Sequence, residues 1–346
     1  MMVVLGIDAH KRSHTVVAAD EAGAELGSVT VSATPQGHLR AVQWAAGWLT
    51  RRWAMEDCRH LSRRFEADLL AAGESVVRVP PKMMAGVRRS ARTRGKSDPI
   101  DALAVARAAL REPDLPVARL DGPAREVKLL TDYRENLVRE RSAIQCRLRW
   151  RLHELSPGWD PPPGSLDRHV VLDEIVARLG AFEGVVAMLA RAEVTRIRAI
   201  TIQANDLYTE IERRVTQIAA SLLELPGCGV LSAAKLIGEA ADITRFRDRN
   251  AYAMFTGVAP IPVWSGNTER FRLNRGGNRQ SNAALHRIAI TQMRIHPPAQ
   301  QLIASHLEAG KTKREALRIL KRRLADVVYR TIIKDTTTQA APARAA

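Results

Sequence analysis

The order of strands and helices near the start of the chain most constrains its fold. Three runs rich in β-branched and small apolar residues follow one another at hairpin spacing, and each of the next two strands is preceded by a helical pattern. In chain order, these segments are strands at 2–8, 14–19 and 26–32, a helix at about 35–52, a strand ending at Glu56, a helix near 60–72 and a strand at 75–79. This order predicts an α/β domain built on a mixed sheet.

Carboxylates lie at key points of that order, which is the order of an RNase H-like sheet. Asp8 closes the first strand and Glu56 closes the fourth. Asp98 and Asp101 lie three residues apart on one face of a later Ala-rich helix. Hard divalent cations are bound by converging carboxylate oxygens, and four clustered acids repel one another without a cation. The sequence therefore predicts a catalytic site for Mg²⁺ or Mn²⁺ formed by these four acids.

Each acid also has an ordinary interpretation. Asp8 fits a turn residue, Glu56 a surface or ion-paired group, and Asp98 an N-cap followed by Pro99 at the first helical position. Only metal binding accounts for all four. His10 and His14 lie in strand-like sequence, so we interpret them as structural residues or phosphate contacts rather than as metal ligands.

The charge of the chain favours a polyanionic partner. Lys and Arg number 53 against 37 Asp and Glu, which gives a formal net charge of +16 and a pI near 10.6. Residues 82–96 hold six Lys or Arg and no acid, which indicates an arm ordered by nucleic acid, and Lys96 is a candidate phosphate contact. Nucleic acid is therefore the expected partner.

The cysteines and the hydropathy of the chain indicate where in the cell the protein is expected. Cys58, Cys146 and Cys228 are too far apart for a zinc motif or a small disulfide framework. The start of the chain lacks a signal-peptide pattern, and no window approaches the roughly 18 apolar residues of a membrane helix. We expect a cytoplasmic, nucleoid-associated protein without membrane partners.

The middle of the chain has a helical texture. Apolar residues recur at helical spacing over about 124–155 and 165–225, on either side of a Pro-rich turn at 156–164. Two long antiparallel helices are expected, with a role in spacing or dimerisation. The predicted domains are an RNase H-like domain at 1–120, a helical coiled-coil spacer at 121–223, a mostly helical domain at 224–335 and a disordered tail at 336–346.

A glycine-containing turn begins the last predicted domain. Leu225-Pro226-Gly227-Cys228-Gly229-Val230 precedes a helical run and resembles a helix-hairpin-helix turn. In such a turn Gly227 and Gly229 let backbone amides approach a phosphate. The same pattern also ends ordinary helices, and both interpretations stay open.

A second cluster of polar residues lies in 257–282. Ser265 precedes Gly266, an arrangement typical of turns. Its neighbours raise interest in it, because several arginines follow at positions suited to binding phosphates and stabilising a transferring phosphoryl group. The candidate nucleic-acid contacts here are Arg270, Arg272, Arg275, Asn278 and Arg279. The basic helical run at 311–330 fits either phosphate binding or a solvated helix face.

With these motifs in hand, the chain resembles insertion-sequence transposases that join a RuvC-like DEDD domain to a C-terminal serine transposase domain. The resemblance spans nearly the whole chain. It rests on the order and spacing of Gly6-Ile7-Asp8, Glu56, Lys96-Ser97-Asp98-Pro99-Ile100-Asp101, Leu225-Pro226-Gly227-Cys228-Gly229, Arg245-Phe246, Gly257-Val258-Ala259-Pro260, Ser265-Gly266 and Arg275-Gly276-Gly277-Asn278.

The resemblance implies a DNA recombinase acting on donor and target DNA. In it, Asp8, Glu56, Asp98 and Asp101 bind divalent metal, and Ser265 attacks a backbone phosphate to form a phosphoserine intermediate. It further implies a composite site made by the RuvC-like domain of one subunit and the serine domain of another, dimers that pair into a tetramer, and guidance by a non-coding bridge RNA.

Two alternatives remain at this point. In a metal-dependent nuclease of the Holliday-junction type, water is the nucleophile and Ser265 is a turn residue. In a non-catalytic nucleic-acid-binding protein, neither the acids nor the serine performs chemistry. Cleavage that survives Ser265→Ala would favour the first, and binding without strand transfer would favour the second.

Overall fold

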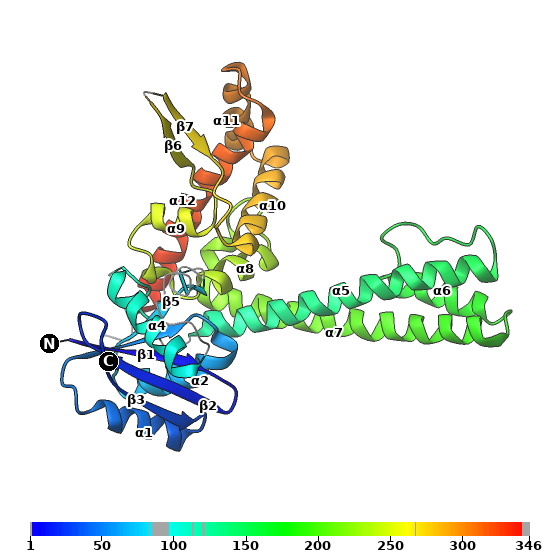
Figure 1. The fold of residues 1–346 in the computed structure, drawn as a ribbon. Helices are drawn as coiled ribbons and strands as arrows, with labels where there is room; N and C mark the ends of the chain where they lie inside the picture. The colour runs from blue at the N-terminus through cyan, green and yellow to red at the C-terminus, as the bar shows by residue number, and fades with distance from the viewer. Residues whose placement is uncertain are drawn as a thin grey trace. The chain divides into compact units, whose positions relative to one another are not determined.

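The computed structural model describes residues 2–81, 83–84, 97–112, 114–119, 122–266 and 268–340. The chain divides into two compact units, Met1–Asp121 and Gly122–Ala346, and each is described by itself (Figure 1). We call them the sheet unit and the helical unit.

The sheet unit is built on five strands. The sheet order is β3-β2-β1-β4-β5, in which β2 is antiparallel to both β1 and β3, whereas β1, β4 and β5 run parallel to one another. The elements are β1 (Val3–Ala9), β2 (Ser13–Ala19), β3 (Glu25–Ser32), α1 (Pro35–Ala45), β4 (Arg51–Glu56), α2 (Arg59–Ala71), β5 (Val76–Val79) and α4 (Asp98–Arg111). The predicted RNase H-like order of strands and helices is confirmed.

Helices cover both faces of this sheet. The odd-numbered residues of β1, such as Leu5 and Ile7, pack in a core with α1 and α2, whereas Val4 packs with the apolar residues of α4. Side chains alternate between the faces of a strand. The same alternation directs Gly6 and Asp8 to the α4 face.

Gly6 allows α4 to lie unusually close to β1. A Cβ atom at Gly6 would lie 2.1 Å from the carbonyl oxygen of Ala102 and 2.6 Å from the amide nitrogen of Ala106. Both atoms belong to the α4 backbone, so a side chain at this position would force helix and strand apart. The glycine thereby sets the height of α4, and of the acids at its start, above the strand that carries Asp8.

Two expectations for the sheet unit are corrected. The first helix ends at Ala45 instead of about 52, because Arg51 and Arg52 pair with Val3 and Val4 as the start of β4. The N-cap of α4 is Ser97 rather than Asp98. Asp98 is the first residue of the helix, so its carboxylate is not the one in the capping position.

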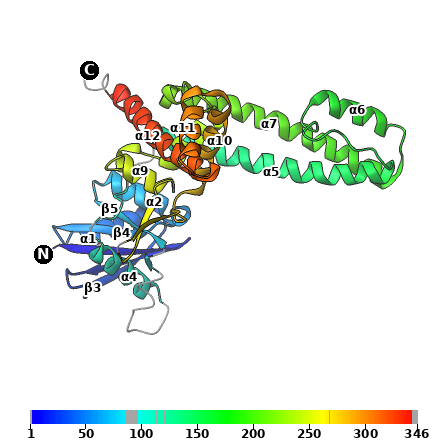
Figure 2. The same ribbon diagram turned by 90° about the horizontal axis from the view of Figure 1, so that it is seen from above.

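Long antiparallel helices form one end of the helical unit. Here α5 (Pro123–Leu155) and α7 (Gly184–Leu223) run side by side in both views, with α6 (His169–Leu179) beside them (Figures 1 and 2). Their antiparallel register is visible in pairs such as Arg196 with Glu140, at 2.7 Å, and Arg151 with Glu193, at 3.1 Å.

The second helical run is shorter than expected. Residues 165–225 were predicted as one helix, but α6 and α7 are separate, and the chain turns between them. Gly184, at the start of α7, has a φ of 90°, a value that glycine adopts without strain and other residues rarely do. The connection between α5 and α7 is therefore the Pro-rich segment together with a third helix.

The other end of the helical unit is a compact group of helices and one hairpin. Its elements are α8 (Val230–Ala240), η1 (Ile243–Arg245), α9 (Arg249–Phe255), β6 (Ile261–Ser265), β7 (Thr268–Arg272), α10 (Arg279–Ile295), α11 (Pro297–Glu308) and α12 (Lys313–Ala340). One apolar core joins α7, α8, α10 and α12. The hairpin β6–β7 is an antiparallel ribbon outside that core.

The predicted tail at 336–346 is partly wrong. Helix α12 continues to Ala340, and the hydroxyls of Thr336 and Thr337 donate to the carbonyl oxygens of Ile332 and Ile333 in the preceding turn. These bonds satisfy the threonine side chains within the helix. Residues 341–346 lie outside the described residues. Across the described part of the chain, every helix is too short or too polar to cross a membrane.

Candidate functional site

The carboxyl ends of two parallel strands place the first two acids side by side. β1 and β4 pair in parallel with Ile7 opposite Met55, so the next residues, Asp8 and Glu56, occupy neighbouring strands at the same sheet edge. Trp53 and Met55 face α1 and α2, and strand alternation directs Glu56 to the α4 face together with Asp8.

The start of α4 brings further acids to this edge. His10 lies between Asp8 and Asp98: its Nε2 atom is 3.1 Å from Asp8 Oδ2 and 3.4 Å from Asp98 Oδ1. One potential ligand atom from each of these residues lies within 4.8 Å of the others. Asp101 is close enough to raise the pKa of Asp8. We call Asp8, Glu56, Asp98, Asp101 and His10 the acidic edge.

The sequence-based prediction missed His10. A metal-ligand spacing between His10 and His14 requires a helix, whereas His10 lies between β1, which ends at Ala9, and β2, which begins at Ser13. The two histidines separate in the structure: His14 is 2% exposed and stacks on Phe65, whereas His10 faces Asp8. The sequence does contain a signal for His10. It lies two residues after Asp8, and residues two apart in extended backbone point to the same face of the sheet.

The electrostatics of the acidic edge favour a cation. Burial raises the pKa of Asp8, His10 lowers it, and the charges of Asp101 and Asp98 raise it further, with a net upward shift. The side chain of Asp8 is 16% exposed, while that of Asp98 is 52% exposed, so one carboxylate is largely shielded from solvent and another faces it. Carboxylates that repel one another, joined by an imidazole donor at a site open to solvent, fit a divalent cation.

Ser265 lies at the tip of the β6–β7 hairpin. It pairs with Thr268 across a two-residue turn, in which Gly266 has a φ of 56°. Primed hairpin turns require this left-handed backbone, which explains the Ser-Gly sequence. The serine is exposed, and its hydroxyl has no hydrogen bond to any described residue.

Two glycine-containing loops pack against each other at the base of the hairpin. A Cβ atom at Gly277 would lie 2.2 Å from the Cα of Gly257, so the two loops touch backbone to backbone. Asn278 caps α10 by accepting from Ser281 at 2.9 Å, and it donates to Glu239 at 2.6 Å. The glycines and Asn278 therefore have structural roles, and the nucleic-acid contact expected of Asn278 stays a prediction.

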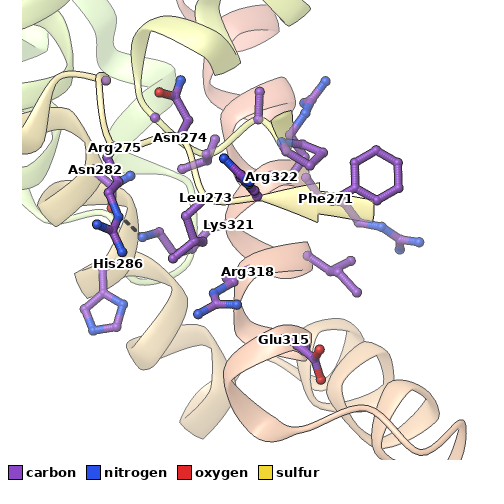
Figure 3. A pocket seen from close by; sticks show the side chains of 18 of the residues that line it. Phe271, Leu273, Asn274, Arg275, Asn282, His286, Glu315, Arg318, Lys321 and Arg322 are labelled. Carbon is purple, nitrogen blue, oxygen red and sulfur yellow. Dashed lines mark hydrogen bonds between the residues drawn. The ribbon is translucent and has the colours of Figure 1, made fainter. Parts of the chain in front are cut away.

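A basic pocket of about 1070 Å³ opens beside the hairpin base (Figure 3). Its walls come from the 257–260 loop, β7 and the loop after it, α10, and α12 with the turn before it. The cationic residues that line it are Arg272, Arg275, Arg279, Lys311, Arg318, Lys321, Arg322 and Arg323, and Glu315 is the acid among the lining residues. We call this the hairpin pocket.

The predicted phosphate contacts are thus distributed unevenly. Arg272, Arg275 and Arg279 line the hairpin pocket, whereas Ser265 and Arg270 are not among its lining residues. Lys96 and most of the basic stretch at 82–96 lie outside the described residues. The sequence left open whether the basic run at 311–330 binds phosphates or is a solvated helix face, and the structure places four of its cations, Arg318, Lys321, Arg322 and Arg323 of α12, in the lining of the pocket.

The predicted helix-hairpin-helix glycines differ from each other. Gly227 has a φ of 79°, and a Cβ atom there would lie 2.9 Å from Thr291 Cβ of α10. Gly229 is the N-cap residue of α8, and a Cβ atom there would meet nothing within 4 Å. Gly227 is accordingly required by packing, while only Gly229 opens onto free space.

Comparison with known proteins agrees with these features. One family model, DEDD_Tnp_IS110, described as a transposase, matches residues 5–157. A second, described as the transposase IS116/IS110/IS902 family, matches residues 219–304. The first match contains all four acids, and the second contains Ser265.

Similar proteins come from insertion elements. An uncharacterized 44.8 kDa protein of element IS116 from Streptomyces clavuligerus is 24% identical over 94% of this chain and 93% of its own length. An uncharacterized 42 kDa protein of IS900 from Mycobacterium paratuberculosis is 24% identical over 97% of this chain and 98% of its own length. Among solved structures, T. thermophilus RuvC in complex with a Holliday junction substrate is similar, at 16% identity and a TM-score of 0.28, over 34% of this chain and 100% of that chain.

The two family matches fall on the two parts of the chain that carry the acidic edge and the serine hairpin, in the order that the sequence motifs predicted. The relatives of IS116 and IS900 extend the similarity over nearly the whole length. The chain belongs to the IS110/IS116 family of insertion-element transposases.

Proposed function

We propose that this transposase cuts and rejoins DNA through a covalent phosphoserine at Ser265, assisted by a divalent cation at the acidic edge. The observation that carries the proposal is the convergence of Asp8, Asp98 and His10 within 4.8 Å, beside Glu56 and Asp101, in a chain that also presents an exposed serine on a hairpin tip. The excess of positive charge supports donor and target DNA as substrates.

The acidic edge fits the role of a cation site through its donor set. Its side chains would hold Mg²⁺ or Mn²⁺ by the carboxylates of Asp8, Glu56, Asp98 and Asp101. When bound, such an ion stabilises negative charge on the oxygens of a reacting phosphate. Gly6 positions α4 for this task, because it sets the distance between the Asp98 end of the helix and β1.

The exposed serine suits nucleophilic attack on a large substrate. In the first step, Ser265 Oγ attacks a backbone phosphorus and loses its proton to a base, while the bond from phosphorus to a sugar oxygen breaks and that oxygen gains a proton. In the second step, a sugar hydroxyl of another strand attacks the same phosphorus and releases the serine. One phosphodiester is lost and one is formed, so no nucleotide cofactor is required.

The serine needs activation from outside its own hairpin, because no described residue hydrogen-bonds its hydroxyl. A composite site, in which the acidic edge of a second subunit reaches Ser265, would supply it. The family resemblance points to the same arrangement, with dimers that form a tetramer and a bridge RNA that selects the DNA. We include these partners in the proposal.

The test is formation of a covalent complex between protein and DNA. Purified protein would be incubated with Mg²⁺, element-end DNA and RNA transcribed from the element flanks, and then analysed on a denaturing gel. We expect an adduct in the wild type, none with Ser265→Ala, and none when EDTA replaces Mg²⁺. Thr268→Ala, which changes the paired hydroxyl residue of the same hairpin, is the matched control and should retain the adduct.

The metal-dependent nuclease that uses water is the competing function. It is favoured by the single observation that Asp8, His10 and Asp98 come together within the sheet unit, without the serine. Cleavage without an adduct, unchanged by Ser265→Ala, would establish it and refute the phosphoserine mechanism.

A further inference from the structure

We infer that the hairpin pocket binds an unpaired strand of nucleic acid, with its cations on the phosphates and Phe271 stacked on a base. This inference deepens the proposed function by naming which form of nucleic acid occupies a particular site. It adds Phe271, Arg318 and Lys321 to the residues that engage the substrate.

Eight Lys or Arg side chains line the pocket against one acid, Glu315, and Arg322 pairs with Asp326, so the remaining excess of positive charge favours an anion. Arg275, Arg279 and Arg318 make no ion pair with any described residue. Lys321 reaches from α12 to Asn282 of α10, at 2.5 Å, a neutral partner that leaves its charge uncompensated (Figure 3). Burial, and then the charge of Arg318, lower the pKa of Lys321. Cations that converge without counter-charge are stabilised by phosphate groups.

The size of the pocket indicates an extended ligand. Its volume of about 1070 Å³ matches the upper end of pockets that enclose whole organic ligands, roughly 300–1,000 Å³, and exceeds what one phosphate fills. The lining cations are spread over β7, α10 and α12, so several phosphates of one chain could be contacted together.

Apolar side chains in the same wall favour an unpaired strand over a duplex. Phe271 is 63% exposed and Leu273 is 52% exposed, and both line the pocket among arginines. In a duplex the base faces are stacked on one another and cannot meet a phenyl ring. Aromatic rings interleaved with cations are the device by which proteins bind single strands. An exposed phenyl ring has no comparable partner on the outside of a duplex.

The hairpin offers a matched control for the ring. Trp264 on β6 is 66% exposed, much like Phe271, but does not line the pocket. Arg294 on α10 is likewise exposed and outside the pocket, so it controls for the loss of one positive charge. Because Phe271 is largely exposed, its truncation removes little packing, and Phe271→Leu keeps apolar volume without the ring.

The experiment measures binding of the full-length protein in EDTA, where metal-dependent chemistry does not occur. Fluorescence anisotropy would follow a labelled single strand of about 12 nucleotides, as DNA and as RNA of the same sequence, and the corresponding DNA duplex. We expect Phe271→Ala and Phe271→Leu to weaken single-strand binding by about 5- to 100-fold, and Trp264→Ala by less than about twofold. Duplex binding should change by less than about twofold in every Phe271 variant.

The salt dependence tests the cations separately. Arg318→Ala should reduce the slope of log affinity against log salt for single strands by about 0.7, as expected for one lost phosphate contact, and Arg294→Ala should leave it unchanged. Tighter binding of the DNA strand or of the RNA strand identifies the source of the ligand, and either supports the inference.

Equal losses for Phe271→Ala and Trp264→Ala, or equal losses on duplex and single strand, would overturn it. The result is independent of catalysis: binding that depends on Phe271 without any covalent adduct in Mg²⁺ would support this inference and refute the proposed function. An adduct with binding indifferent to Phe271 would do the reverse.

Discussion

The acidic edge and the serine hairpin are built in opposite ways. The acidic edge collects residues from β1, β4 and α4, is partly buried, and holds like charges together. The hairpin carries Ser265 at the tip of one local ribbon, exposed and without a hydrogen-bond partner among the described residues. The first site is preorganised by packing, while the second depends on what docks against it.

This difference predicts different responses to mutation. The acids of the acidic edge lower the stability of the fold, because they repel one another, but they are needed to bind a ligand. Neutralising one of them should therefore raise stability and lower activity. Residues at the hairpin tip affect chemistry with little effect on folding. The predictions below break or sharpen this contrast, beginning with the largest expected effect.

Loss of Asp8 should remove chemistry and yet relieve the fold. Asp8→Asn is expected to lower covalent-complex formation at least about 10³-fold. In metal-free buffer near neutral pH it should also stabilise the protein by about 0.5–2 kcal/mol, since a charge that burial and Asp101 disfavour is removed. Ser265→Ala should lose the adduct equally but change stability by less than about 0.5 kcal/mol. Chemical denaturation with the gel assay measures both effects, and a destabilised Asp8→Asn would break the contrast.

Acid should weaken the sheet unit through His14. Burial, with the charges of His38 and His10, lowers the pKa of His14 from 6.5 to about 4, and its Nδ1 atom has no partner among the described residues. A lowered histidine pKa contributes stability that is present above 6.5 and is lost as the pH falls toward 4. The loss amounts to about 3 kcal/mol at full extent.

The measurement is the free energy of unfolding between pH 7 and about 4, in the wild type and in His14→Phe. The variant stays uncharged and keeps an aromatic ring against Phe65. In the wild type the ring centroids of His14 and Phe65 lie 5.0 Å apart. We expect a shallower pH dependence in the variant. Parallel curves for the two proteins would show that His14 is not the acid-sensitive group.

A side chain on Gly6 should separate α4 from β1. Gly6→Ala is expected to cost about 1–3 kcal/mol of stability, because its Cβ would clash with backbone atoms of Ala102 and Ala106. It should also weaken Mn²⁺ binding by displacing Asp98. Gly229→Ala is the control, since its Cβ would meet nothing within 4 Å and its backbone φ is −76°. Thermal unfolding and metal titration test both, and unaltered metal affinity in a folded Gly6→Ala would contradict the role given to this contact.

His10 is expected to be a metal ligand with the smallest effect of the set. His10→Gln should weaken Mn²⁺ binding by about tenfold, or about 1.4 kcal/mol, because it replaces an imidazole donor with a weaker amide. Electron spin echo spectroscopy of bound Mn²⁺ should detect nitrogen coupling in the wild type and lose it in the variant. Mn²⁺ that binds without nitrogen coupling would leave the carboxylates as ligands and exclude His10.

The sequence-based predictions were accurate for features that depend on neighbouring residues and less accurate for features that depend on distant contacts. The five strands were predicted in order because period-two patterns and turn residues act over a few neighbours, whereas the first helix was predicted too long because only pairing with β1 decides where β4 begins. The tail was misjudged at 336–340 because polar threonines satisfy their hydroxyls within α12.

The sequence by itself determined the family, the strand order and the faces on which Asp8 and Glu56 lie, since these follow from alternation along a strand and from motif spacing. Only the tertiary structure decided that His10 joins the acids, that Gly6 lets α4 approach β1, and that α12 completes the hairpin pocket. Each of these depends on distances between packed elements far apart in the chain, which no local preference of the backbone encodes.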